Sequence, residues 1–172
     1  MASLIDNLIE TLNSENEEYQ KLLKLSHSKT DVIVRADLDN LTRITDEEQE
    51  IVVRINSLET TREKTMKEIA RILNTNVEGL KLEVLISLLN KTPREQKDLA
   101  IIHDKLKLTL REMKLVNERN AALLKEAIEM VDFNVNMVQA MRKAPETANY
   151  GRTAYNTGDM LGGVSGGFDA KQ

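Results

Sequence analysis

The feature that most constrains the fold is a long apolar repeat between the two prolines of the chain, Pro93 and Pro145. Proline fits the first turn of a helix but ends a helix from within, because it lacks the N–H and clashes with the preceding turn. Between the prolines, apolar residues recur at intervals of three, four and seven, the period of one helix face. The pattern predicts one helix from residue 93 to about residue 143, roughly 75 Å long.

The sequence TPRE at residues 92–95 predicts where this helix begins. Thr92 is suited to cap a helix, and Pro93 then occupies the first helical position, where no N–H is needed. Glu95 stands three residues after the threonine, the spacing of a capping box. We therefore expect the helix to start at Pro93.

Asparagines interrupt the apolar face of this helix. Counting in sevens along the face gives Leu99, Leu106, Met113, Asn120, Ala127, Asn134 and Met141. A buried amide without partners is costly, so such residues need an explanation. Two interpretations remain open: the asparagines are satisfied inside a bundle, or this face is not permanently buried.

Two further long helices are predicted upstream, at residues 3–34 and 38–74, each with one apolar stripe. The short link at 35–37 favours a tight reversal in which Asp37 caps the second helix, and it makes the two helices antiparallel neighbours. Arg62 on the second stripe is interpreted as an edge residue without chemistry. Leu82, Leu85, Ile86 and Leu89 indicate a short amphipathic connecting helix.

The chain contains five aromatic residues and 30% charged residues, which suits helices better than sheets. The predicted fold is all-α: an elongated antiparallel bundle of three long helices with a short connecting helix, over residues 1–144. Six of the seven glycines fall in residues 145–172. This segment is predicted to be a flexible, disordered tail. Its scattered apolar residues either become ordered on a partner, or the segment is a flexible end without a binding role.

Several classes of function are not expected. A net charge of −4 argues against nucleic acid or an anionic membrane as partner. The chain has no cysteine, no apolar run of about 18 residues and no signal-peptide pattern at its start, so a cytoplasmic protein is the default. His27 and His103 lack the spacing of a metal site. We expect no metal, no cofactor and no enzymatic activity.

Several short motifs resemble those of a known family. They are Lys29 and Asp37 around the first reversal, EEQ at 47–49, LETTRE at 58–63, and N-x-x-N-x-x-LL from Asn117. In this order the chain resembles the FlgN-like flagellar export chaperones. The resemblance implies a cytoplasmic chaperone that binds carboxyl-terminal segments of hook–filament junction proteins before type III secretion, and that contacts the flagellar export apparatus.

Taken with the resemblance, the apolar face of the third long helix becomes the predicted client-binding surface. Its residues are Asn117, Asn120, Leu124, Val131, Asn134, Val135, Val138 and Met141. Methionines along the face would adapt to more than one client. The alternative is that these are ordinary interior residues of a three-helix bundle. The resemblance also makes Tyr150 and Tyr155 candidates for docking at the export gate, without choosing between them.

A second function of another class is a structural coiled-coil protein that self-associates through the same stripe. A chaperone should stay a small, defined oligomer and form a stoichiometric complex with its client. A scaffold should assemble by itself.

Overall fold

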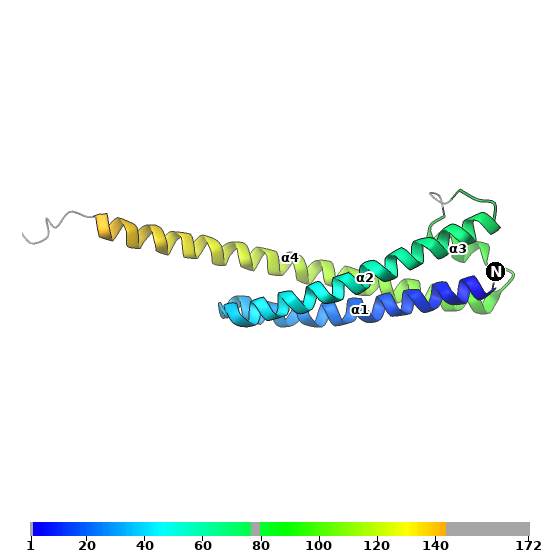
Figure 1. Ribbon diagram of the computed structural model, residues 1–172, viewed down its shortest axis with the longest axis horizontal. Helices are drawn as coiled ribbons and strands as arrows, with labels where there is room; N and C mark the ends of the chain where they lie inside the picture. Colours follow the sequence, from blue (N-terminus) through cyan, green and yellow to red (C-terminus); the bar gives the residue numbers. More distant parts are fainter. Residues whose placement is uncertain (1, 77–79, 144–172) are drawn as a thin grey trace, which may run out of the picture. The chain divides into compact units, whose positions relative to one another are not determined.

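The computed structural model describes residues 2–76 and 80–143, and these form four α-helices and no strand. They are α1 (Ala2–Val34), α2 (Leu38–Ile72), α3 (Leu82–Leu88) and α4 (Pro93–Lys143) (Figure 1). The predicted all-α class is confirmed, and the predicted helix bounds are close to the observed ones. The predicted tail at 145–172 lies outside the described residues.

The chain divides into two compact units, Met1–Glu129 and Met130–Gln172. Of the second unit, the structure describes residues 130–143, which are the last turns of α4. The predicted division into residues 1–144 and 145–172 therefore stays a prediction.

The reversal between α1 and α2 is as tight as the sequence predicts. Ala36 adopts a left-handed conformation with φ of 53°. Its N–H donates to the carbonyl of Ile33, and that of Asp37 donates to the carbonyl of Val32, which is the pattern of a Schellman motif. The Asp37 carboxylate then accepts from the N–H of Asn40 at 3.1 Å and caps α2. The hydrogen bonds with Asn40 hold the pKa of Asp37 below its usual value.

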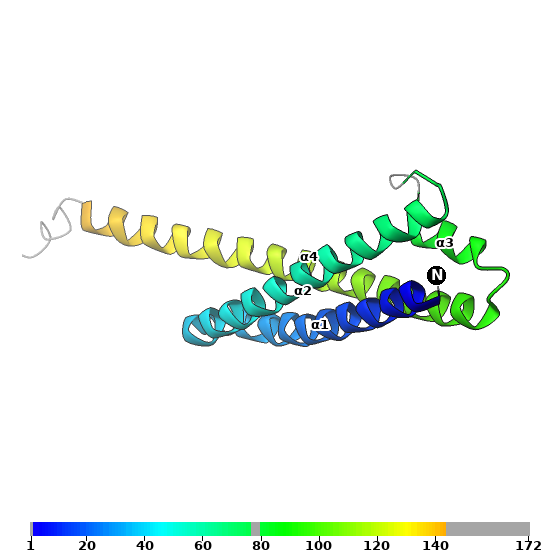
Figure 2. The same cartoon turned by 45° about the vertical axis from the view of Figure 1, so that its right-hand side comes forward.

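Polar pairs along the hairpin join α1 to α2. Tyr19 donates to Glu59 at 3.2 Å, and Arg62 donates to Glu15 at 2.9 Å. Residue numbers rise along α1 as they fall along α2, so the helices are antiparallel, as they appear in Figures 1 and 2. Arg62 thus has a partner that the sequence did not predict. The Glu15 carboxylate is buried, and its burial raises its pKa despite the guanidinium beside it.

The main apolar core lies at the end of the first unit where α1 and α4 begin and α2 ends. Figure 2 shows α3 at this end. All four helices contribute, and α3 inserts the fully buried Leu85. The core residues are Ile5, Leu8, Leu12, Ile69, Ala70, Leu80, Leu85, Leu89, Leu99, Ile102 and Leu106. The connecting helix is therefore part of the core rather than a simple link.

The start of α4 is tied to the connecting helix by side chains. The Gln96 amide donates to the carbonyl of Ile86 at 2.9 Å. The Thr92 hydroxyl donates to the carbonyl of Leu89 at 3.4 Å. α4 begins at Pro93, as predicted. The expected capping box between Thr92 and Glu95 does not form within the described residues. The Thr92 hydroxyl instead donates to the turn that precedes it.

Candidate functional site

Burial along α4 changes sharply after one residue, Asn120. Before this point α4 contributes a regular series of buried residues, namely Leu99, Ile102, Leu106, Thr109, Met113 and Asn120. Beyond Asn120 no residue of α4, as far as the structure describes it, is buried, and residues 128–143 are all exposed. The apolar pattern continues through both parts, so the second part presents apolar side chains to solvent.

Polar side chains join α4 to α1 in the buried part. Thr109 donates to the amide oxygen of Asn16 at 2.9 Å. Further along, Ser26 donates to the amide oxygen of Asn117 at 3.2 Å. Numbers rise together along both helices, so α1 and α4 run in the same direction within the first unit.

Asn120 is the last and most completely bonded residue of this polar series. Its amide nitrogen donates to the backbone carbonyl of Ser26 at 2.8 Å, and its amide oxygen accepts from Thr30 at 2.6 Å. The residue is 4% exposed. Because both ends of the amide are used, burying Asn120 carries no unsatisfied polar group.

A pocket of about 350 Å³ lies beside Asn120, between α1, α2 and α4. Its lining includes Lys29 of α1 and Glu48 of α2, which form an ion pair at 2.7 Å with both side chains largely buried. Asn117 and Leu124 complete it from α4. Residues of three separate sequence motifs therefore meet at one place in the first unit.

The described part of the second unit is an apolar helix surface. Seven large side chains there are between 44% and 67% exposed: Met130, Val131, Phe133, Val135, Met137, Val138 and Met141. Isolated exposed apolar residues are normal, whereas a contiguous set of this size is typical of interaction surfaces.

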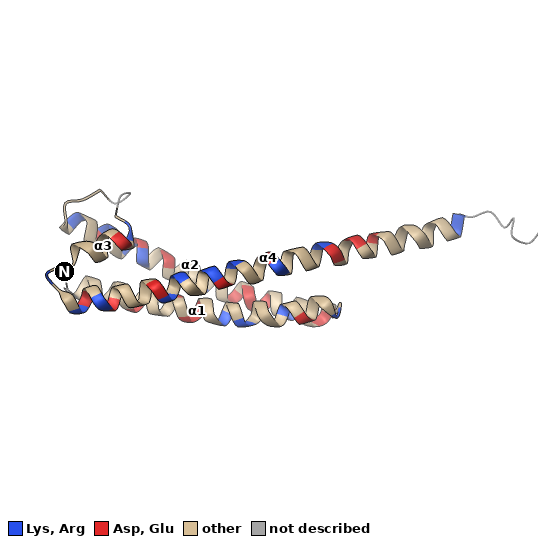
Figure 3. Cartoon of the chain, turned by 180° about the vertical axis from the view of Figure 1, so that it is seen from behind, with Lys and Arg blue, Asp and Glu red and all other residues tan. Residues whose placement is uncertain are grey.

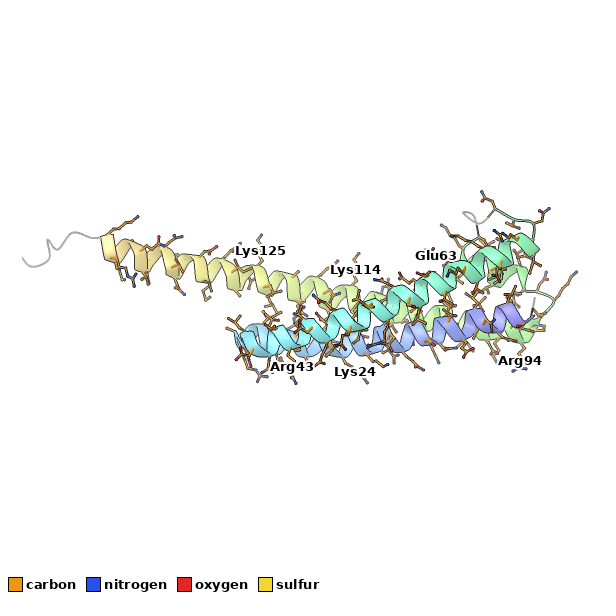
Figure 4. The ribbon with its side chains drawn as sticks, viewed as in Figure 1. Lys24, Arg43, Glu63, Arg94, Lys114 and Lys125 are labelled. Carbon is orange, nitrogen blue, oxygen red and sulfur yellow. The ribbon has the colours of Figure 1, made fainter. Side chains whose placement is uncertain are left out.

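This surface is also almost free of charge. Before it, α4 carries exposed charges such as Lys114 and Lys125 (Figure 4), which pair within the helix with Glu118 at 3.8 Å and Glu129 at 4.0 Å. Residues 130–141 contain a single charged residue, Asp132. Figure 3 shows the resulting uncharged stretch shortly before the basic end of the helix. Such a surface is suited to apolar rather than ionic contacts.

The structure sorts the eight predicted site residues into two groups. Val131, Asn134, Val135, Val138 and Met141 are exposed in the second unit. Asn117, Asn120 and Leu124 lie in the first unit around the pocket, where Asn120 is buried and bonded to α1. The prediction missed Phe133, which is 65% exposed. Its signal was present, since it is an aromatic residue in the least charged part of the helix.

Other predicted features have separate outcomes. Tyr150 and Tyr155 lie outside the described residues. His27 contacts Glu112 at 3.3 Å, and His103 contacts Asp104 at 3.1 Å, so each histidine has its own carboxylate. Within residues 2–76 and 80–143 there is no group of three or more residues arranged to hold a metal ion. No helix in that same part of the chain is both long and apolar enough to cross a membrane.

Comparison with known proteins adds one finding. The family model described as "FlgN protein" matches residues 1–158, a range that includes all four helices and the exposed apolar surface. No curated protein and no solved structure matches the chain at a significant level.

Proposed function

The chain belongs to the FlgN protein family, a family of flagellar export chaperones, and we propose that it binds helical terminal segments of hook–filament junction proteins. Binding would take place in the cytoplasm, before the clients enter the flagellar type III export apparatus. The observation that supports the proposal most is the exposed, uncharged apolar surface of residues 130–141.

The physical basis is burial of apolar area on a preformed helix. Each Å² removed from water contributes roughly 25 cal/mol, so several exposed side chains together supply substantial binding energy. An amphipathic client helix can lie along such a surface with its own backbone groups satisfied. Met130, Met137 and Met141 have unbranched, adaptable side chains, which would allow the surface to repack against more than one client.

Self-association as a structural coiled coil is the second candidate, because exposed apolar helices also pair with copies of themselves. The family assignment favours the chaperone. Asn134 stands in the middle of the apolar surface, and one such asparagine lowers the stability of a coiled coil while fixing its register and oligomeric state. The two functions differ in what the isolated protein does.

The test uses the full chain and a purified full-length hook–filament junction protein, mixed and analysed by size-exclusion chromatography with light scattering and by titration calorimetry. We expect a defined species alone and a stoichiometric complex with the client. Val131→Asp should weaken the complex by tenfold or more, because a charge would enter an apolar contact. Asn136→Asp is the matched control, because it adds the same charge on the polar side of the same turns.

Two results would contradict the proposal. One is the absence of any complex between the wild-type protein and the junction protein. The other is concentration-dependent growth of the wild-type protein alone, abolished by Val131→Asp, which would support the scaffold instead.

Docking at the export apparatus remains a separate proposal. Tyr150 and Tyr155 are its candidate residues, and both lie beyond the described part of the chain. Changing each tyrosine to alanine should leave client binding intact while reducing export of the client, measured as secreted junction protein. If neither change alters secretion, the docking role is excluded for both residues.

A further inference from the structure

The apolar surface of residues 130–141 is much wider than the buried face of the same helix. At 100° per residue, the buried residues of α4 in the first unit fall within a sector of roughly 80° around the helix axis. That sector is what α4 needs to pack against its own chain. The exposed apolar side chains of residues 130–141 span roughly 200° by the same measure.

Two flanks make up this wide surface. The valine flank consists of Val131, Val135 and Val138, spaced by four and three residues. The methionine flank consists of Met130, Phe133, Met137 and Met141. Their centres lie roughly 120° apart, with Asn134 between them, while Asp132, Asn136 and Gln139 form the polar back of the helix. Figure 4 shows side chains projecting from more than one side of this end of α4.

We propose that residues 130–141 bind two helical segments of one client at the same time, one against the valine flank and the other against the methionine flank. This inference rests on the proposed chaperone function and specifies the form of the client. The bound state would be a three-helix unit in which α4 supplies one helix and the client supplies two.

The bound segments must be helical because the surface offers almost no hydrogen bonds. An extended segment laid on valine, methionine and phenylalanine side chains would bury backbone N–H and C=O groups without partners. A helix satisfies these groups internally and presents side chains at the spacing of the two flanks.

Two segments are required because one helix covers one side of another. In the first unit, packing buries a single narrow sector of α4. A client helix seated on the valine flank would leave Phe133 and its neighbours in water, and a helix on the methionine flank would leave the valines there. Only a partner with two helices removes both flanks from water.

A second copy of the chain does not meet this requirement. A symmetric pair through α4 covers one flank of each copy and leaves the other bare. The surface also provides no charge pairing that would hold two copies together, because Asp132 is its single charged residue.

The first test compares one variant on each flank with a control on the polar back. Val135→Asp and Phe133→Asp each change an exposed residue, so folding, checked by circular dichroism, should be unchanged. Each should weaken binding of the full-length junction protein by about tenfold or more. Asn136→Asp should leave affinity within about twofold. Sensitivity at one flank alone, with the other variant binding like wild type, would overturn the inference and leave the chaperone function intact.

The second test identifies the segments in contact. A photo-crosslinking amino acid is placed at residue 133 or at residue 135 of the full chain, and crosslinked client peptides are mapped by mass spectrometry. We expect the two positions to label two client segments separated in sequence. Labelling of one common segment from both positions would overturn the inference, as would crosslinks between copies of the chaperone in the client complex. Failure of the wild-type protein to bind the client would instead reject the proposed function.

Discussion

Two stretches of α4 carry similar apolar patterns but differ in burial. Residues 99–120 are buried at regular intervals, whereas residues 130–141 are exposed throughout. Asn120 and Asn134 occupy equivalent positions in the repeat of seven, yet Asn120 is 4% exposed and bonded to α1, while Asn134 is exposed. The repeat identifies an apolar face but does not specify whether the same chain or a partner covers it.

The two asparagines also have different reasons to be polar. Asn120 bonds both Ser26 and Thr30 and so fixes how α4 lies along α1. Asn134 has solvent around it and interrupts an apolar surface that would otherwise favour self-association. The two interpretations left open by the sequence therefore both apply, each to a different asparagine. Substitutions in the two stretches should accordingly separate stability from binding.

The largest expected difference concerns apolar truncations. Leu99 is fully buried, so Leu99→Ala should reduce the free energy of unfolding by about 2–5 kcal/mol through lost burial and a cavity. Met137 is exposed in the second unit, and Met137→Ala should change it by less than about 0.5 kcal/mol. Urea denaturation followed by circular dichroism measures both. Equal losses would mean that residues 130–141 belong to the folded core.

Asn120 and Asn134 should show a smaller difference in the free energy of unfolding when each is changed to alanine. Asn120→Ala removes the two hydrogen bonds that tie its buried amide to Ser26 and Thr30 of α1, so we expect a loss of about 1–3 kcal/mol. Asn134→Ala should be neutral within about 0.5 kcal/mol. The same denaturation experiment applies to both. A neutral Asn120→Ala would show that its hydrogen bonds to α1 do not hold the helix in solution.

The smallest expected effect on the free energy of unfolding concerns Glu15, whose carboxylate is buried in the first unit. Burial raises its pKa above the ordinary value of 4.5, more than Arg62 lowers it. Its stabilising contribution is therefore complete below about pH 4.5 and is lost as the pH rises through the raised pKa. Glu15→Gln stays neutral, so its stability relative to wild type should increase from pH 4.5 to pH 7.

The control for Glu15 is Glu17→Gln, which removes an exposed carboxylate from the same turn of α1. Unfolding free energies of the three proteins at both pH values separate burial from net charge. A relative stability of Glu15→Gln that falls with rising pH would show that the ion pair with Arg62 outweighs burial.

The sequence predicts the helices well because their signals are local. Asp37 caps α2 and Pro93 starts α4 as expected, since a cap or a proline acts on its own turn. Through the resemblance to a chaperone family, the sequence also predicts Val131, Val135 and Val138 as client-binding residues. The structure describes all three as exposed, and their role stays a prediction.

What the sequence could not predict depends on contacts between distant residues. The partners of Asn120 are 90 and 94 positions away, and no local pattern relates them. The same holds for Arg62 and Glu15, 47 positions apart, whose pairing follows from the register of the hairpin. The place of Asn120 in the interior, rather than on the open face, therefore required the structure.

Amide hydrogen exchange, read by mass spectrometry with and without the junction protein, tests the central claim most directly. In the free protein we expect residues 99–120 to exchange slowly and residues 130–143 rapidly, because the latter have no cover. Saturating client should slow exchange in residues 130–143 by tenfold or more and leave residues 99–120 little changed. Unchanged exchange in residues 130–143, with new protection elsewhere in the chain, would contradict the account.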